Sequence, residues 1–450
     1  MININKTTNI NKFIFITIIL IVPIILRLLI IYKIKPLIIY DSQDYINLAK
    51  NISSRNFDDY GGNRTPVYSI FITIFKMNYN VIRIVQIVMG LSITILLTWM
   101  TYTITRIRWI SLIAGLFYGW NIIQIFFENM IMTETLTTFW MTLSMAITIK
   151  ITNSRKDNKS IGKWILLAGL FYALSGFTRP LFMFMPFLVM IAYIVIWPNL
   201  YKKWIIYLLL PSVILMGGWS IYNKYKLNYF GLTTTTGYNL LNHSGAFIEM
   251  APDRYSLIKD LYVEARSKWE KSHKDHMGTI SLVRPVIMER MHISYAELSS
   301  ILTKMSLEIF IRHPILYGKS VMKGFTLFWY VSGPKRWKAD IGDTLPNWIG
   351  DLIQAERILL MTVNMLFLLI FIFLCLNMTP IIHKIKIKIP PVIYFMSFFC
   401  MVTAIIQACM DYGANNRFII PIQPLIAFIV ISSLAFIIKG HKTNKITVNI

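Results

Sequence analysis

The chain has 450 residues, of which 56% are hydrophobic, and its formal net charge at pH 7 is +24. A water-soluble domain of this length could not bury so much apolar surface, so the composition excludes a soluble protein and predicts an all-α polytopic membrane protein. The positive charge is typical of basic loops beside anionic membrane lipids, and nucleic acid is not an expected partner.

Apolar runs predict about ten membrane-spanning helices. They lie near residues 12–33, 80–103, 109–125, 133–150, 163–177, 180–197, 204–222, 352–376, 390–409 and 418–438. With the N-terminus inside, one set of short loops carries the lysine and arginine clusters, and the opposite short loops carry no basic cluster. The positive-inside rule therefore predicts a multi-pass membrane protein with both termini in the cytoplasm.

This topology divides the chain into three regions. Residues 1–222 form an N-terminal transmembrane module, whose first outer loop spans 34–79. Residues 223–350 form a large extracytoplasmic loop, and residues 351–450 form a C-terminal transmembrane module.

The large outer loop is expected to contain helices of its own. Two amphipathic patterns predict helices near 253–271 and 294–312. Residues 313–333 are apolar enough to span, but Lys319 and Lys323 lie on one helical face. That pattern is typical of an interfacial helix in the headgroup plane.

The first outer loop contains the stretch IIYDSQDYINLAKN, residues 38–51. Its apolar positions predict a short amphipathic helix along the membrane, with Ser42 as the N-cap. Asp41 then lies on the loop just before the helix, where it either faces a cavity at membrane level or is an ordinary solvated acid. Asp44, in the first turn, suits the helix dipole.

Arg64 lies in YGGNRTPVYSIF, residues 60–71. Gly61 and Gly62 predict a tight turn, and Pro66 is expected to start a short apolar helix. Arg64 is therefore held between a turn and a helix start. It either binds a phosphate group in bidentate fashion or extends to the lipid headgroups.

Two glutamates fall in FFENMIMTETLTTFW, residues 126–140. Glu128 is expected in a loop, and Glu134 in the first turn of a spanning helix with Thr133 as its cap. Glu134 either complements the helix dipole or pairs with an arginine at the mouth of a cavity.

Three further polar residues belong to the same predicted face. Arg179 lies before Pro180 in a hairpin with almost no loop, and Arg417 comes immediately before the last span. His243 lies in a polar loop, as either a general base or a hydrogen-bonded side chain. Polar residues gathered at one face of a membrane protein indicate a functional site there.

In their order and spacing, these stretches resemble the GT-C glycosyltransferases that use polyprenyl-phosphate sugars, such as the protein O-mannosyltransferases and the lipid A aminoarabinose transferases. The resemblance covers roughly residues 12–438. It rests on the stretches YDSQDYINLAKNI, NRTPVYSIF, TETLTTFW, GFTRPLFMFMP, YNKYKLNYFGLTTTTGYNLL, FIRHPILYGKSVMKGFTLFW and NNRFIIPIQPL.

The resemblance implies a GT-C transmembrane helix bundle that works as an inverting glycosyltransferase with an extracytoplasmic active site. It would move a monosaccharide from a polyprenyl-phosphate donor to an acceptor hydroxyl on a glycan, lipid or protein. The family's catalytic aspartate falls on Asp41, and its donor phosphate-binding residues fall on Arg64, Arg179 and Arg417. Candidates for a second acid or an acceptor contact are Asp44, Glu128, Glu134 and His243.

Family members often have another acid directly after the catalytic aspartate, where this chain has Ser42. No cofactor is therefore predicted, although the nearby Asp44 leaves a divalent metal as an alternative. The chemistry itself fits the residues: attack on the sugar needs a base near the acceptor hydroxyl, and guanidinium groups stabilise the departing phosphate.

Two other functions stay open at this point. A transporter or flippase of lipid-linked glycans would place polar groups near the bilayer midplane, often with internal repeats, whereas no convincing repeat is found in this sequence. An O-antigen polymerase or ligase would share the outer-face site, but those families depend on a late outer loop.

Overall fold

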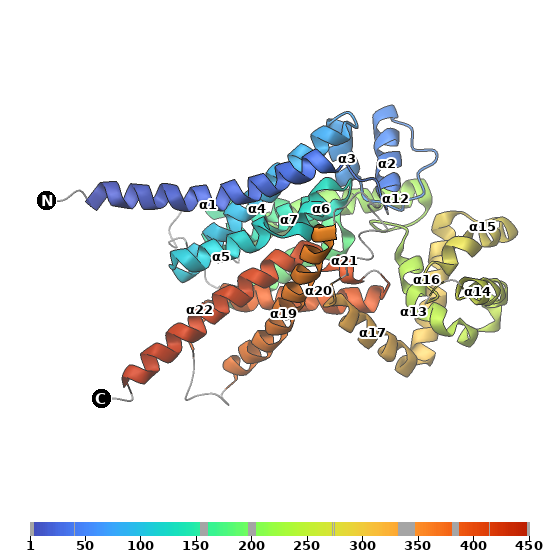
Figure 1. Cartoon of the computed structure of the whole chain (residues 1–450). Helices are drawn as coiled ribbons and strands as arrows, with labels where there is room; N and C mark the ends of the chain where they lie inside the picture. Colours follow the sequence, from blue (N-terminus) through green and yellow to red (C-terminus); the bar gives the residue numbers. More distant parts are fainter. Residues whose placement is uncertain are drawn as a thin grey trace.

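The computed structural model describes residues 4–39, 41–153, 161–196, 204–271, 273, 275–331, 347–379, 387–413 and 415–447. Within these ranges the chain is helical and contains no β-strand beyond an isolated bridge between Leu37 and Met130. Figure 1 shows long helices running side by side, with shorter helices gathered at one end of the bundle. The predicted all-α polytopic class is confirmed.

The long bundle contains the N-terminal and C-terminal helices. They are α1 (Ile4–Lys33), α4 (Tyr79–Thr105), α5 (Arg108–Gly119), α6 (Ile122–Asn129), α7 (Thr133–Thr152), α8 (Ile161–Thr178), α9 (Met185–Ile196), α11 (Ile205–Ser212), α12 (Gly218–Leu227), α19 (Asn347–Met378), α20 (Pro391–Met410) and α22 (Gln423–Thr447). Short 3₁₀ turns, Pro180–Phe182 and Ile420–Ile422, precede α9 and α22.

The shorter helices lie at the end of the bundle opposite the free ends of α1 and α22 (Figure 1). They are α2 (Ser42–Ser54), α3 (Pro66–Ile74), α13 (Thr236–Ser244), α14 (Ser256–Trp269), α15 (Thr279–Met291), α16 (Tyr295–Arg312), α17 (Pro314–Phe328) and α21 (Asn415–Phe418). We call α13 to α16, with the 3₁₀ turns Gly245–Met250 and Asp253–Tyr255, the outer domain. Its buried core includes Leu241, Ile248, Tyr262, Leu298 and Met305.

Each of the ten predicted spanning segments coincides with helical structure. Among the described residues, six single helices are long and apolar enough to cross a membrane, and α5 with α6 would make a seventh span if that bent pair crosses as one. In the apolar part of the span Asn416–Lys439, 83% of the residues are buried, whereas in Trp348–Met378 the share is only 28%. The second helix exposes apolar side chains along its length. The first is therefore central, and the second suits contact with lipid tails.

Several boundaries differ from the sequence prediction, and α1 and α22 extend further at the chain ends than predicted. The segment 109–125 is two helices, α5 and α6, which meet at 47° because Asn121 caps α6 by accepting a hydrogen bond from the Gln124 amide at 2.8 Å. Glu128 consequently lies in α6 and not in a loop. The predicted helix 204–222 continues through a π-helical turn, Val213–Gly217, to Leu227.

The outer domain was predicted in part. Helices α14 and α16 confirm the two expected helices, and Ser294 starts α16 with a full capping box to Glu297. Helices α13 and α15 were not predicted. Helix α17 confirms that residues 313–333 contain a helix, although residues 332–333 lie outside the described residues. Its position at the membrane surface stays a prediction.

The orientation of the chain in the membrane also stays a prediction, because the basic residues at 154–160, 201–203 and 380–386 lie outside the described residues.

A buried ion pair fastens α1 to the break between α5 and α6. Arg27 is 1% exposed, and its Nε and Nη2 each donate to one oxygen of Glu128 at 2.7 Å. Its Nη1 donates to the Pro23 and Gly119 carbonyls at 3.1 and 3.0 Å. A Cβ at Gly90 of α4 would collide with the Glu128 carboxylate, so α4 is shaped to admit this pair.

We predict that Glu128→Ala destabilises the protein strongly. The substitution leaves the Arg27 guanidinium buried without a counter-charge, which costs roughly 3–5 kcal/mol. The unfolding free energy in detergent micelles measures the loss. The double variant Arg27→Met/Glu128→Leu is expected to recover most of it, and a Glu128→Ala protein as stable as the wild type would contradict a structural role for the pair.

Candidate active site

The loop between α1 and α2 is fixed by backbone hydrogen bonds to the end of α6 and to the segment that joins α6 to α7. Leu37 donates to the Asn129 carbonyl at 2.9 Å, and its own carbonyl accepts from Ile131 at 2.9 Å. The Ser42 hydroxyl donates to the Ile39 carbonyl at 2.6 Å, and Ser42 is the first residue of α2. The prediction of Ser42 as the N-cap is wrong by one residue. Asp41 occupies the cap position without a side-chain cap bond, so its carboxylate is available for other partners.

Arg64 lies on a loop that is anchored from several sides. Gly62 has a φ of +79°, and a Cβ there would lie 2.6 Å from both Leu227 and Thr234, so the turn needs glycine. The Thr234 amide and hydroxyl donate to the Gly62 and Gly61 carbonyls at 2.8 and 2.7 Å. Pro66 is the first residue of α3, as predicted. Arg64 is therefore presented from a rigid backbone.

Glu134, Arg179 and Arg417 come together from three elements. Glu134 is the second residue of α7, whose cap position is Met132 and not the predicted Thr133. Arg179 is extended between α8 and the turn Pro180–Phe182, and Arg417 lies in the four-residue helix α21. Both guanidinium groups lie near the Phe418 ring, at 4.4 Å for Arg179 and 5.9 Å for Arg417.

Three arginines and three carboxylates form one alternating chain of ion pairs, which we call the charge network. Its members, in order, are Asp44, Arg64, Asp41, Arg417, Glu134 and Arg179. The network has no net charge, because the three positive and three negative groups cancel. Every member was among the residues predicted for the site, with Asp44 and Glu134 as candidates for a second acid or an acceptor contact.

Asp41 lies at the centre of the charge network. One of its carboxylate oxygens is 2.8 Å from Arg64 Nη2, and the other accepts a hydrogen bond from Arg417 Nη2 at 2.8 Å. Burial by itself would raise the pKa of Asp41, but the attraction of Arg64, Arg417 and Arg179 outweighs burial and holds the pKa below its ordinary value. Asp41 is therefore ionised at neutral pH.

The carboxylates of the charge network become more exposed from Glu134 to Asp41 and then to Asp44. The side chain of Glu134 is 0% exposed and lies 3.0 Å from Arg179 and 2.9 Å from Arg417, whereas Asp41 is 32% and Asp44 39% exposed. The network thus runs from a buried end inside the bundle to a solvent-exposed end beside α2. A ligand that enters from the solvent-exposed end reaches Asp41 before it reaches Glu134.

The family model described as dolichyl-phosphate-mannose-protein mannosyltransferase matches residues 56–230 of this chain, a little over a third of its length. This match confirms the resemblance to GT-C glycosyltransferases. At the general level, the chain is a multi-pass membrane glycosyltransferase. The matched span includes Arg64, Glu134 and Arg179, and leaves Asp41 and Arg417 outside. No curated protein and no solved structure matches the chain.

Two of the predicted candidates do not join the charge network of this glycosyltransferase. Glu128 is bound to Arg27 in the ion pair between α1 and α6. His243 lies in α13, where its Nδ1 shares a hydrogen bond of 2.7 Å with the Ser320 hydroxyl of α17. Burial lowers the pKa of His243 to about 4, so the imidazole is neutral at pH 7.

The charge network does not fit a divalent metal. Among the described residues, no three His, Cys, Asp or Glu side chains are grouped so that they could hold a metal ion. Asp41 and Asp44, the acids nearest the solvent, both face Arg64, whose positive charge would repel a cation. The arginines suit an anion instead.

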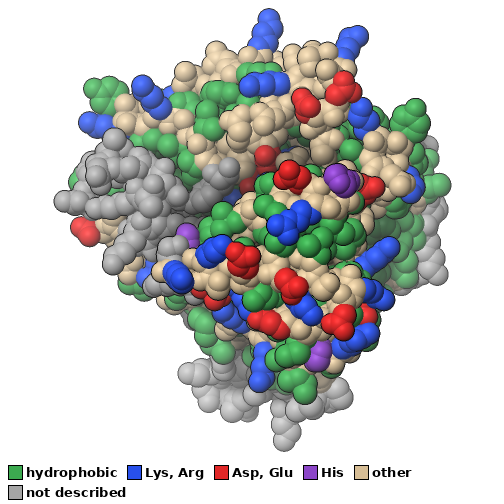
Figure 2. All heavy atoms as spheres, turned by 90° about the vertical axis from the view of Figure 1, so that its right-hand side faces the viewer, with side chains coloured by type: hydrophobic (Ala, Val, Ile, Leu, Met, Phe, Trp, Pro, Cys, Tyr) green, Lys and Arg blue, Asp and Glu red, His purple; other side chains and the backbone are tan. Residues whose placement is uncertain are grey.

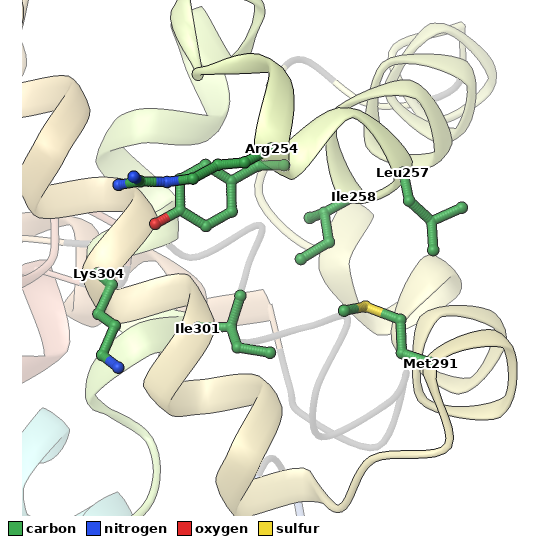
Figure 3. A pocket seen from close by; sticks show the side chains of 7 residues that line it. Arg254, Leu257, Ile258, Met291, Ile301 and Lys304 are labelled. Atoms are coloured by element: carbon green, nitrogen blue, oxygen red, sulfur yellow. The ribbon is translucent and has the colours of Figure 1, made fainter.

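The outer domain contains a cavity of about 540 Å³ between α14, α15 and α16 (Figure 3). Apolar side chains form most of its wall, with two cationic side chains among them: Arg254, Tyr255, Leu257, Ile258, Met291, Ile301 and Lys304. No member of the charge network lines this cavity. Over the surface of this end of the molecule, acidic and basic side chains are interspersed (Figure 2).

Sequence reasoning missed two contacts at this end of the glycosyltransferase. Asp44 pairs with Arg64, whereas the sequence suggested a helix-dipole role or a second acid and no pairing with an arginine. Arg27 was not considered as the partner of Glu128, although a lone arginine inside an apolar run is a usable signal, because a buried charge in a membrane needs a counter-charge.

We predict that the two ends of the charge network differ in their effect on stability. Glu134→Gln leaves the buried Arg179 without its carboxylate and is expected to cost roughly 3–5 kcal/mol of unfolding free energy. Asp44→Asn removes an exposed pair and is expected to cost about 0–1 kcal/mol. Denaturation of both variants in the same detergent tests this, and equal losses would contradict the gradient of burial.

Proposed function

We propose that this glycosyltransferase moves a monosaccharide, with inversion, from a polyprenyl-phosphate carrier to an acceptor hydroxyl at the extracytoplasmic face, with Asp41 as the general base. The observation that carries the proposal is an ionised, partly exposed carboxylate whose two oxygens are held by two arginines. The same few residues then offer a base and a phosphate site side by side, which this reaction requires.

In the proposed reaction, the acceptor oxygen forms a bond to the anomeric carbon while the bond from that carbon to the phosphate oxygen breaks. The acceptor proton passes to Asp41, and polyprenyl phosphate leaves with the bonding electrons. Asp41 is a weak base because its pKa is low. It takes the proton as the new bond makes the acceptor oxygen acidic, so its position matters more than its basicity.

Arg64, Arg179 and Arg417 are the proposed contacts for the donor phosphate. Their guanidinium groups already lie within one ion-pair network, so little reorganisation is needed when charge develops on the leaving phosphate. Since the network is neutral, an incoming phosphate competes with Asp41 and Asp44 for these arginines. Donor binding would thereby loosen Asp41 from its partners and raise its pKa toward that of an effective base.

The outer domain is the proposed acceptor-binding region. Tyr295, the first residue of α16, lies about 4 Å from the position that a Cβ at Gly61 would take, beside the loop that carries Arg64. The cavity in Figure 3 belongs to the same domain and has an apolar floor for part of an acceptor.

The test of the function is transfer from labelled polyprenyl-phosphate sugars by the protein in liposomes. Asp41→Asn is expected to lower the transfer rate about 10²–10⁴-fold, the usual contribution of a general base, with donor binding retained. Asp59→Asn, an exposed acid of the same outer loop, is the matched control. Transfer by Asp41→Asn at the wild-type rate would exclude Asp41 as the base and turn attention to Glu134.

The pH dependence of transfer gives a second prediction. The kcat/KM for the donor, which depends on the free protein, requires ionised Asp41 and therefore falls as the pH drops through the pKa of Asp41. This acidic limb lies below the ordinary aspartate value because the pKa of Asp41 is lowered in the free protein. Arg417→Gln removes one of the lowering charges and is expected to shift the limb upward by roughly 1 pH unit. An unchanged limb in Arg417→Gln would contradict the assignment.

A further inference from the structure

The turn between α20 and α21 is held by a buried carboxylate outside the charge network. Asp411 directly follows α20 and is 7% exposed. Its Oδ1 accepts hydrogen bonds from the Gly413 amide at 2.7 Å and from the Asn242 side-chain amide at 2.9 Å. The first bond shapes the turn, and the second ties it to α13 of the outer domain.

The outer domain encloses this turn closely. Asn242 is itself fixed, because its backbone carbonyl accepts a hydrogen bond from His276 Nε2 at 2.9 Å. A Cβ at Gly413 would lie 2.8 Å from Met277 Sδ and 3.4 Å from Asn242 Nδ2. The turn therefore fits against two separate parts of the outer domain.

Helix α17 supports the same region from another side. Its Tyr317 hydroxyl donates to the Cys409 carbonyl at the end of α20, at 2.9 Å. Its Ser320 bonds His243, the neighbour of Asn242 in α13. The stacked rings of Tyr317 and Phe310, with centroids 3.9 Å apart, join α17 to α16. The outer domain, α17 and the end of α20 thus form one connected body.

Arg417 comes four residues after Gly413, in α21. That helix has only four residues, and so short a helix is not stable on its own, because the cost of forming its first turn is not repaid. The position of Arg417 therefore depends on its own ion pairs and on the contacts that hold α21. Those contacts include packing against α17 and, on the N-terminal side, the turn held by the hydrogen bonds of Asp411.

We propose that Asp411 and Asn242 are positioning residues, which hold Arg417 against Asp41 and so couple the outer domain to the base. The consequence for catalysis rests on the proposed function, whereas the coupling itself does not. When the outer domain is docked on the turn, Arg417 bridges Asp41 and Glu134. When the Asn242–Asp411 bond is lost, α21 loosens and Asp41 loses one of its two arginines.

The first experiment measures Arg417 without reference to activity. Full-length protein in membranes is treated with phenylglyoxal, which modifies accessible arginines, and the modification rate at each arginine is followed by mass spectrometry. Asn242→Ala and, from the other side of the bond, Asp411→Ala are each expected to speed modification of Arg417 about fivefold, the effect of one lost hydrogen bond on a local opening. Arg64, on its own anchored loop, is expected to keep its rate.

Two variants serve as controls for this labelling. Asp411→Asn keeps an oxygen that can accept both hydrogen bonds, so Arg417 is expected to stay as protected as in the wild type. Asn239→Ala changes the same residue type one turn earlier in α13 and is expected to have no effect on Arg417. An unchanged Arg417 rate in both Asn242→Ala and Asp411→Ala would overturn the proposal, even if stability fell.

The second experiment connects the coupling to catalysis. The charged groups around Asp41 that lower its pKa are Arg64, Arg417 and Arg179. Asn242→Ala is therefore expected to move the acidic limb of kcat/KM for the donor upward, in the direction that Arg417→Gln moves it, and to add nothing in the Arg417→Gln background. Faster labelling of Arg417 without any movement of the limb would uphold the coupling and count against Asp41 as the base. A further shift in the Arg417→Gln background would overturn the route through Arg417.

Discussion

The rest of the site depends on the two ion pairs of Asp41. An arginine in the last part of the chain and an arginine in the first outer loop meet at one carboxylate, 376 residues from Arg417 and 23 from Arg64 in sequence. Neither Arg417 nor Glu134 could be buried alone, since a charge without a partner in a protein interior costs several kcal/mol or more. Their pairing brings α2, α3, α7, α8 and α21 to one point. It also leaves Asp41 ionised and partly open to solvent, which is the state that a general base needs before the reaction begins.

Much of this could be predicted from the sequence. The apolar runs predicted the helices, and a topology consistent with the loop charges placed Asp41, Arg64, Glu134, Arg179 and Arg417 on one face. The partners could not be predicted, because a polar residue at a membrane surface needs no counter-charge there, and only three-dimensional packing decides which groups lose water. Glu128 illustrates this: its place after an apolar run suggested a loop, but Asn121 begins a new helix that carries Glu128 inward to Arg27. The N-cap of α2 is Asp41 and not Ser42, because the amides of Asp44 and Tyr45 already donate to the Asp41 carbonyl.

The two buried charge systems argue for different roles. The Arg27–Glu128 pair is buried and bidentate, and Arg27 also donates to backbone carbonyls of α1 and α5. These contacts suit a structural role and leave no polar group to bind a transported substrate. The charge network instead ends at solvent beside the outer domain. A glycosyltransferase needs a site of the second kind, whereas a transporter would need a polar pathway between the two faces. The outer domain, through the Asn242–Asp411 hydrogen bond, lies against the turn that precedes Arg417 in the chain.

The central claim is that the charge network is both the base and the phosphate site of one reaction. The most direct test is an experimental structure of the protein with a polyprenyl-phosphate sugar analogue in which carbon replaces the bridging oxygen at the anomeric centre, so that transfer cannot proceed. If the charge network binds the donor phosphate, the phosphate oxygens are expected within hydrogen-bonding distance of at least two of Arg64, Arg179 and Arg417. The anomeric carbon is expected to face Asp41. A phosphate bound elsewhere, with all ion pairs of the network intact, would contradict it.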